Sequence, residues 1–270
     1  MIVSPPRPCA DPSGDNGVVF AGFRPYAHRG GPESAAENSP NAFAAAVGLG
    51  YRFLETDVRP TRDGVAVVHH DATLDRTTDL TGLVRSRPWT DVRRAALRDG
   101  CSPMRLEELL EAFPDAHVNV DVKESAVVAP TLEALRRTGA WRRVCVTSFS
   151  TARLAAVRKA TPPWVETAAG PREVVAHRMG LSRSRGMHRR RGEDTRLPHR
   201  LQVPHRLRGR PVVDAAFVRR AHARGLAVDV WTVNDAVDME RLLDLGVDGI
   251  MTDAPTLLRE VLRSRGRWSP

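Results

Sequence analysis

The chain has 270 residues, which suits a single α/β barrel, and its contents of 41% hydrophobic and 27% charged residues are ordinary for a globular protein. The formal net charge is +9, and residues 178–210 carry all of this excess, with 11 arginines against two acidic residues. Three widely spaced cysteines without a CxxC pair argue against a disulfide framework and a zinc site, and no apolar run approaches the roughly 18 residues of a membrane span.

Two segments are predicted to lie outside the folded core. Residues 1–22 are rich in Pro, Gly and Asp, which predicts a flexible tail, and they contain no apolar stretch typical of a signal peptide. We therefore expect a cytoplasmic protein. Residues 180–199 are predicted to form an Arg-rich loop, which is either simply solvated or attracted to anionic lipid headgroups or nucleic acid.

Short apolar runs bounded by polar residues predict the strands. In chain order these runs lie at residues 25–29, 53–58, 117–122, 143–149, 164–169, 200–204, 226–233 and 249–253. Amphipathic stretches between most of them predict helices at residues 38–49, 126–138, 151–160, 171–179, 212–224, 235–245 and 255–264. Asn38 is expected to be the N-cap of the first helix, and Gly139 to end a helix in a left-handed conformation.

Strands that alternate with helices predict a parallel sheet, and eight such units predict a (β/α)8 TIM barrel over residues 23–265. One gap of about sixty residues separates the second and third strands. Within it, residues 59–71 have the pattern of a hairpin that turns at Arg62, Asp63 and Gly64. Residues 72–104 are then predicted to form a small insertion at the barrel mouth, and residues 105–113 a helix that leads back to the barrel.

Charged residues interrupt two of the predicted strands. Glu55 and Asp57 lie two apart on the second strand, and Asp121 and Lys123 lie two apart at the third. Residues two apart on a strand share a face, so each pair can point into the barrel. Because the strands of a parallel barrel are normally apolar, two successive charged pairs are more typical of a site than of a solvated surface.

Three carboxylates in a confined site cannot all stay ionised without a cation. Oxygen ligands are typical of sites for a hard divalent ion, so Glu55, Asp57 and Asp121 predict a site for Mg²⁺ or Ca²⁺. Lys123 would then neutralise an anionic group of the substrate.

Histidines follow two of the predicted strands. His28 ends the first strand, and the adjacent His69 and His70 end the hairpin. Two imidazoles beside a bound anion can act as acid and base on the two sides of a scissile bond. Since side chains alternate along an extended segment, only one of His69 and His70 can face the site.

Six segments together resemble the glycerophosphodiester phosphodiesterase family. They read AHRGGPESAAENSPNAF, FLETDVRPTRDGVAVVHHDATLDRTTDLTG, VNVDVK, VTSF, VWTVN and GIMTD. The family pattern has an HRG motif, an ExDV strand, a TxDG turn, and an HD dipeptide followed by LxRTT. The resemblance covers about residues 24–262.

The resemblance implies a TIM barrel with a small insertion after the second strand. It also implies metal-dependent hydrolysis of a small-molecule glycerophosphodiester, rather than action on nucleic acid, to give glycerol 3-phosphate and an alcohol. Glu55, Asp57 and Asp121 would be the metal ligands, although the family commonly has a glutamate where this chain has Asp121. His28 and His70 would be the general acid and base.

The remaining site residues also follow from the resemblance. Arg29 and Lys123 would bind the phosphate, and Trp231 would line the pocket for the glycerol or the alcohol. The family's HD dipeptide falls on His70 and Asp71, which selects His70 over its neighbour. Asp71 would orient the ring or brace the turn.

Two alternatives remain open at the level of sequence. A lysophospholipase D would share the fold and the site but accept lysolipids, and its basic loop could contact an anionic membrane surface. A catalytically idle barrel could instead bind anions or nucleic acid through residues 178–210, although every expected catalytic residue type is present. The sequence contains no indication of an oligomeric state.

Overall fold

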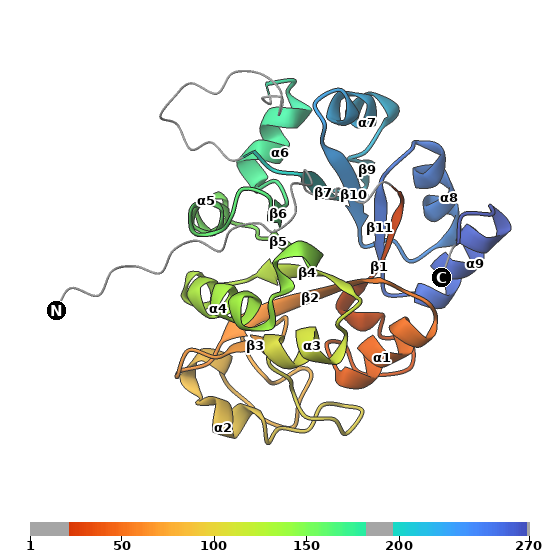
Figure 1. Cartoon of the computed structure of the whole chain (residues 1–270). Helices are drawn as coiled ribbons and strands as arrows, with labels where there is room; N and C mark the ends of the chain where they lie inside the picture. Colours follow the sequence, from red (N-terminus) through yellow and green to blue (C-terminus); the bar gives the residue numbers. More distant parts are fainter. Residues whose placement is uncertain (1–21, 182–196, 269–270) are drawn as a thin grey trace.

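Eight parallel strands enclose the centre of the computed structural model, which describes residues 22–181 and 197–268 (Figure 1). They are β1 (Arg24–Ala27), β2 (Phe53–Pro60), β4 (His117–Val122), β5 (Val144–Thr147), β6 (Glu166–Thr167), β7 (Arg200–Pro204), β10 (Ala227–Trp231) and β11 (Gly249–Thr252). Their order is β6-β5-β4-β2-β1-β11-β10-β7, and a parallel bridge between Ala168 and Arg200 joins the two end strands. The predicted (β/α)8 TIM barrel and all eight predicted strands are thus confirmed.

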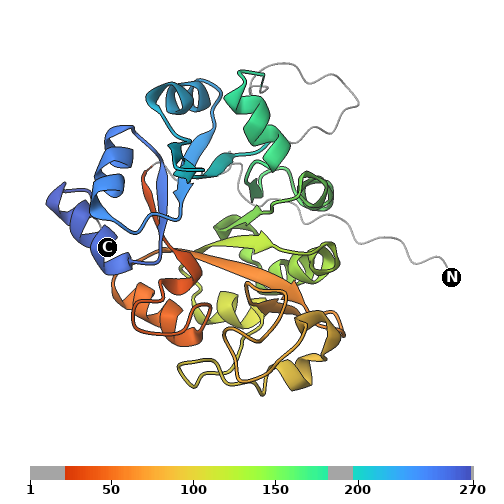
Figure 2. The same cartoon turned by 180° about the vertical axis from the view of Figure 1, so that it is seen from behind.

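A ring of helices surrounds the strands, as the view from behind also shows (Figure 2). The helices are α1 (Pro40–Gly48), α3 (Leu106–Ala112), α4 (Val128–Thr138), α5 (Thr151–Ala160), α6 (Pro171–Arg178), α7 (Ala215–His222), α8 (Ala236–Asp244) and α9 (Pro255–Ser264). Strands and helices alternate along the chain, which is the connectivity expected of repeated β/α units. Within the described residues, none of the helices is both long and apolar enough to cross a membrane.

Helix α1 begins one residue later than predicted, so the prediction that Asn38 is its N-cap is wrong. Ser39 is the N-cap instead, and its hydroxyl accepts a hydrogen bond from the amide of Ala42 at 3.1 Å. Pro40 occupies the first helical position, where its missing N–H leaves no backbone hydrogen bond unmade. Asn38 has a left-handed φ of 59°, and its side chain accepts a hydrogen bond from Thr56.

The gap after the second strand contains the predicted hairpin and insertion. Strand β3 (Ala66–Val68) pairs antiparallel with β2, and the segment beyond it contains the short helices η2 (Val84–Ser86) and α2 (Trp89–Val92). Val67 and Leu74 help form a small separate core for this insertion. A second hairpin, made by β8 (Arg206–Leu207) and β9 (Arg210–Pro211), was not predicted and delays the start of α7 to Ala215.

The predicted tail at residues 1–22 and the predicted basic loop at 180–199 fall almost entirely outside the described residues. Their conformation and the expected contact of the loop with lipid headgroups therefore stay predictions.

Apolar side chains on the outer faces of the strands pack against the helices. Leu54 and Leu135 belong to one buried cluster, and Phe217 and Ile250 belong to another. Because side chains alternate along β2, the residues on either side of Leu54 point into the barrel. Burial of the outer faces thus fixes which side chains reach the interior.

Ion pairs fill the N-terminal end of the barrel interior. Arg24 donates to Glu166 at 2.7 Å, and Arg200 donates through two nitrogens to Asp229. Arg200 and Asp229 are 2% and 0% exposed, so each charge depends on the other for compensation. These pairs connect β1 with β6 and β7 with β10, and they therefore tie together strands on both sides of the barrel closure.

We predict that Arg200→Met lowers the free energy of unfolding by about 3–5 kcal/mol, because it leaves the buried Asp229 carboxylate without its cation. Urea denaturation measures the loss. Arg136→Ala is the control, since Arg136 pairs with Glu133 on the exposed face of α4 and should change stability little. Equal, small effects of the two substitutions would contradict the interpretation.

Candidate active site

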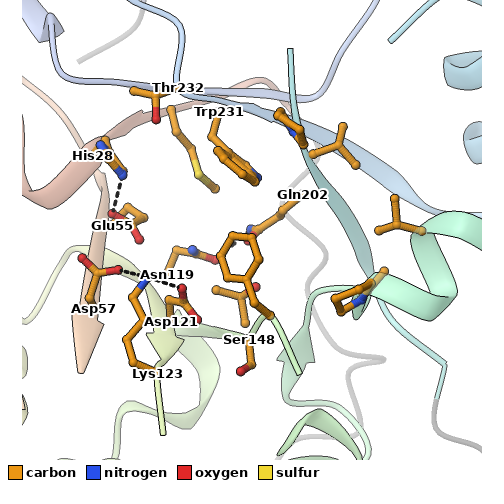
Figure 3. A pocket seen from close by; sticks show the side chains of 18 of the residues that line it. His28, Glu55, Asp57, Asn119, Asp121, Lys123, Ser148, Gln202, Trp231 and Thr232 are labelled. Atoms are coloured by element: carbon orange, nitrogen blue, oxygen red, sulfur yellow. Dashed lines mark hydrogen bonds and ion pairs between the residues drawn. The ribbon is translucent and has the colours of Figure 1, made fainter. Parts of the chain in front are cut away.

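A cavity of about 460 Å³ opens at the C-terminal ends of the strands (Figure 3). It brings together every site residue that the sequence predicted: His28, Arg29, Glu55, Asp57, His70, Asp121, Lys123 and Trp231. These residues come from β2, β4 and β10 and from the segments after β1, β3 and β4. The position agrees with the face of the barrel that holds active sites in enzymes of this architecture.

Lys123 lies between two carboxylates of neighbouring strands. Its Nζ atom is 2.7 Å from Asp57 Oδ1 and 2.6 Å from Asp121 Oδ2. The two aspartates are directly opposite in the register of β2 and β4. Burial lowers the pKa of Lys123, but the two carboxylates raise it by more, so the ammonium stays charged.

Glu55 is buried next to the same charges. Its Oε2 atom accepts a hydrogen bond from the backbone amide of Arg29 at 3.1 Å and lies 3.7 Å from Nε2 of His28. Burial and the negative charge of Asp57 raise the pKa of Glu55 to about 7. Burial is the larger of these causes, so Glu55 favours its neutral form more than an exposed glutamate does.

The backbone after β1 is held in an unusual conformation. Arg29 has a φ of 52°, and Gly30 and Gly31 follow with φ of 85° and 70°. A Cβ atom on Gly30 would lie 2.8 Å from the Cβ of Ala42, and one on Gly31 would lie 2.5 Å from the Pro255 ring. Only glycine fits this tight turn, which directs both His28 and Arg29 towards the carboxylates.

His28 is anchored by Asp253, which does not belong to the group formed by Glu55, Asp57 and Asp121. Its Nδ1 atom is 2.6 Å from Asp253 Oδ1, and Asn234 donates to the other oxygen of Asp253 at 3.0 Å. Burial lowers the pKa of His28, but Glu55 and Asp253 together raise it above its ordinary value. Asp253 and Asn234 had no predicted role, although they end the GIMTD and VWTVN segments.

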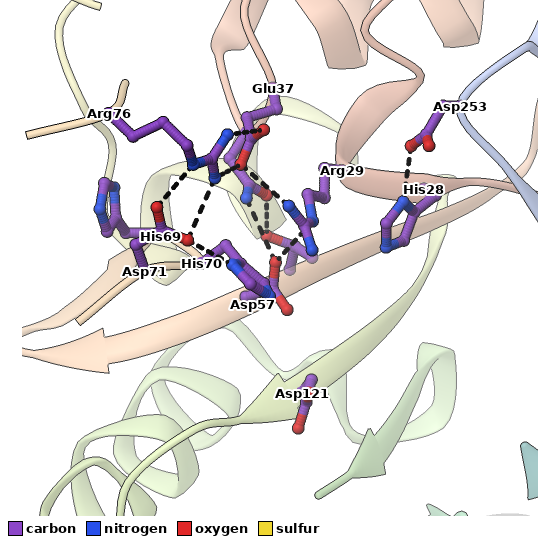
Figure 4. Close-up of polar contacts among 12 residues, drawn as sticks. His28, Arg29, Glu37, Asp57, His69, His70, Asp71, Arg76, Asp121 and Asp253 are labelled. Carbon is purple, nitrogen blue, oxygen red and sulfur yellow. Dashed lines mark hydrogen bonds and ion pairs between the residues drawn. The ribbon is translucent and has the colours of Figure 1, made fainter. Parts of the chain in front are cut away.

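His70 is anchored in the same way at the other side of the site. Its Nδ1 atom is 2.6 Å from Asp71 Oδ1 (Figure 4). Burial lowers the pKa of His70, and the opposing effects of Asp57 and Asp71 are smaller. His69 is buried outside the cavity, where its Nε2 atom contacts the carbonyl oxygen of Thr73 at 2.9 Å. Of this pair, only His70 lines the cavity.

The opposite half of the cavity is apolar. Trp231 packs edge-to-face against Phe149, with ring centroids 5.5 Å apart. This side is completed by Pro171, Val174, Val175, Val203, Pro204, Leu207 and Met251. Of these residues only Trp231 had a role predicted from the sequence, because isolated apolar residues show no pattern that distinguishes a pocket wall from a core.

The donor atoms at the mouth fit a hard divalent cation. The described residues contain no ready-made group of three or more His, Cys, Asp or Glu side chains that could hold a metal ion. However, Asp121 Oδ1 is buried and has no hydrogen-bond partner in the described part of the chain, and burial raises the pKa of Glu55. An ion bound by oxygen atoms would supply what both carboxylates lack.

Comparison with known proteins identifies the family of the chain. The model of the glycerophosphoryl diester phosphodiesterase family matches residues 28–257. A probable glycerophosphodiester phosphodiesterase of Mycobacterium tuberculosis is 42% identical and aligns over 86% of this chain and 87% of its own. A lysophospholipase D of Rattus norvegicus is 28% identical, with 89% and 86% covered.

The fold also matches a solved structure of a putative glycerophosphoryl diester phosphodiesterase. The crystal structure of a putative glycerophosphoryl diester phosphodiesterase from Silicibacter pomeroyi superposes with a TM-score of 0.75 at 25% identity. The match covers 93% of this chain and 96% of that protein.

Proposed function

The chain belongs to the glycerophosphoryl diester phosphodiesterase family and is a glycerophosphodiester phosphodiesterase, and we propose that its His28 and His70 form an acid–base pair that works with a divalent cation, Mg²⁺ or Ca²⁺. The products are glycerol 3-phosphate and an alcohol. One observation supports the proposal most: two histidines with carboxylate-anchored Nδ1 atoms line one cavity together with a cluster of carboxylates.

Glu55, Asp57 and Asp121 hold the cation in this proposal. When bound, the cation supplies positive charge that stabilises the negative charge developing on the phosphate. Arg29 and Lys123 bind the phosphate oxygens, and both already lie at the carboxylates, within 3.3 Å and 2.7 Å of Asp57. A positive rim around a phosphate positions it and favours the more highly charged transition state.

The histidines move the protons. One takes a proton from the nucleophile and the other protonates the departing alkoxide. With water as the nucleophile the two products form directly, whereas attack by the 2-hydroxyl of the glycerol gives a cyclic phosphate that water then hydrolyses to glycerol 3-phosphate. In each ring the Nδ1 atom is tied to Asp253 or Asp71, so Nε2 is the atom left for transfer. The carboxylate partner orients the ring and stabilises its charged form, as in other His–Asp pairs.

We predict that His28→Ala and His70→Ala each lower kcat for glycerophosphocholine by about 10²–10⁴-fold, the usual effect of removing a general acid or base. Both proteins should keep the circular dichroism spectrum of the unsubstituted chain. His69→Ala should retain most of the activity, because His69 lies outside the cavity. Near-normal turnover by either of the first two variants would exclude the proposed pair.

We also predict that EDTA abolishes hydrolysis and that Mg²⁺ or Ca²⁺ restores it, because Asp121 Oδ1 is buried and has no hydrogen-bond partner among the described residues, so a bound cation would give it one. Asp121→Asn should raise the metal concentration needed for half-maximal activity. A steady-state assay with titrated metal measures both effects. Full activity in EDTA after dialysis would show that the carboxylates serve another purpose.

A lysophospholipase D activity is the second candidate, and the apolar half of the cavity favours it. Phe149, Val175 and Leu207 line the cavity although their exposed fractions are 59%, 57% and 64%. Exposed apolar residues around a pocket mark a site for an apolar ligand. A single acyl chain of a lysolipid would cover them, whereas the headgroup of glycerophosphocholine alone would not.

This candidate predicts a higher kcat/KM for lysophosphatidylcholine than for glycerophosphocholine. Leu207→Asp should lower the value for the lysolipid by about tenfold or more, in line with the transfer free energy of one leucine side chain, and leave glycerophosphocholine hydrolysis unchanged. Competition assays with both substrates measure the ratio. A lower kcat/KM for the lysolipid, unaffected by Leu207→Asp, would leave the small diesters as the substrates.

A further inference from the structure

Arg76 lies outside the cavity, in the LDRTT segment, and has no part in the function proposed above. Its side chain is 45% exposed, yet it reaches back over the edge of the site (Figure 4). It makes four hydrogen bonds to two carboxylates, one from the segment after β1 and one from the segment after β3. Such a contact set is unusual for a surface arginine, because exposed ion pairs usually involve a single flexible partner.

The guanidinium group binds both carboxylates with two bonds each. Towards Asp71, Nε donates to Oδ2 at 2.6 Å and Nη2 donates to Oδ1 at 3.1 Å. Towards Glu37, Nη1 donates to Oε2 at 2.7 Å and Nη2 donates to Oε1 at 2.6 Å. The planar fork of arginine fits this geometry, and a lysine ammonium could not reproduce it.

Each carboxylate has a second partner inside the cavity. Asp71 holds Nδ1 of His70 at 2.6 Å, and Glu37 accepts from Nη1 of Arg29 at 3.1 Å. Arg76 is therefore the central link of a chain that runs from His70 to Arg29. One end of this chain is a proposed proton-transfer group, and the other is a proposed phosphate ligand.

We propose that Arg76 is a positioning residue that sets His70 and Arg29 in place at the same time, an inference that rests on the proposed function. Through Asp71 it fixes the plane of the His70 ring. Through Glu37 it neutralises a carboxylate that would otherwise attract Arg29 away from the phosphate. The two effects act on different kinetic constants, because ring orientation affects the chemical step and the Arg29 charge affects phosphate binding.

The test is Arg76→Ala, assayed with glycerophosphocholine at saturating metal. We expect kcat to fall by about 10- to 100-fold, the range for a misplaced reactive group, and KM to rise severalfold. The Kd of sn-glycerol 3-phosphate, measured by calorimetry, should rise with KM. Arg76→Lys should recover only part of each loss, since one ammonium cannot bind both carboxylates bidentately. Arg85→Ala is the matched control: Arg85 is an exposed arginine of the same insertion, and its substitution should change neither constant.

Double variants separate the two branches. Adding Glu37→Gln to Arg76→Ala removes the carboxylate that attracts Arg29, so KM and the Kd of glycerol 3-phosphate should return towards the starting values while kcat stays low. Adding Asp71→Asn to Arg76→Ala should lower kcat little further, because both substitutions act on the same ring.

Wild-type constants in Arg76→Ala would overturn the inference while leaving the phosphodiesterase function intact. A fall in kcat with an unchanged KM, together with a lowered Tm, would also overturn it, because that result would show a merely structural role. A wild-type protein that hydrolyses no glycerophosphodiester with any metal would overturn the proposed function itself and the inference with it. The three results are distinguishable in one set of assays.

Discussion

The mouth of the barrel is organised around an excess of buried negative charge. Glu55, Asp57 and Asp121 are 5%, 2% and 3% exposed, and they lie on adjacent strands whose register places the two aspartates opposite each other. Carboxylates this close and this buried cannot all stay ionised unless cations are near. Lys123 and Arg29 lie 2.7 Å and 3.3 Å from Asp57 and lower its pKa, whereas burial raises the pKa of Glu55 to about 7. A divalent cation would add positive charge beside these carboxylates. A phosphate group would then bind next to the cation.

The rest of the barrel makes this arrangement possible. Ion pairs such as Arg200 with Asp229 compensate the charges at the N-terminal end of the interior. The tight turn at Gly30 and Gly31 brings His28 within reach of Glu55. On the far side of the cavity, apolar residues including Phe149 form a wall that would suit the alcohol or acyl portion of the substrate.

Much of the site could be predicted from the sequence because strand geometry is simple. Residues two apart share a face, so Glu55 with Asp57 and Asp121 with Lys123 had to point the same way once the strands were assigned. The partners of the histidines could not be found by this reasoning. Asp253 is 225 positions away from His28 in the sequence, and its contact depends on the parallel pairing of β1 with β11. Only the register of two sequence-distant strands brings these residues together.

Loop-dependent features were also beyond the sequence patterns. Arg76 and Glu37 are 39 positions apart and meet only because the insertion folds back over the segment before α1. The start of that helix shows the same limit on a smaller scale. Asn38 and Ser39 are both good N-cap residues, and the choice of Ser39 follows from Asn38 being bonded to Thr56 of β2.

The central claim is that His28 and His70 have opposite roles in proton transfer. The most direct measurement compares His28→Ala and His70→Ala on two glycerophosphodiesters, one with choline and one with p-nitrophenol as the leaving group. Because p-nitrophenolate leaves without a proton, the variant that lacks the general acid should recover most of its activity on that substrate, while the other variant should not. The predicted result is that one of the two variants, and not the other, recovers activity on the p-nitrophenyl substrate. Equal recovery of both, or of neither, would contradict a division of labour between the two histidines.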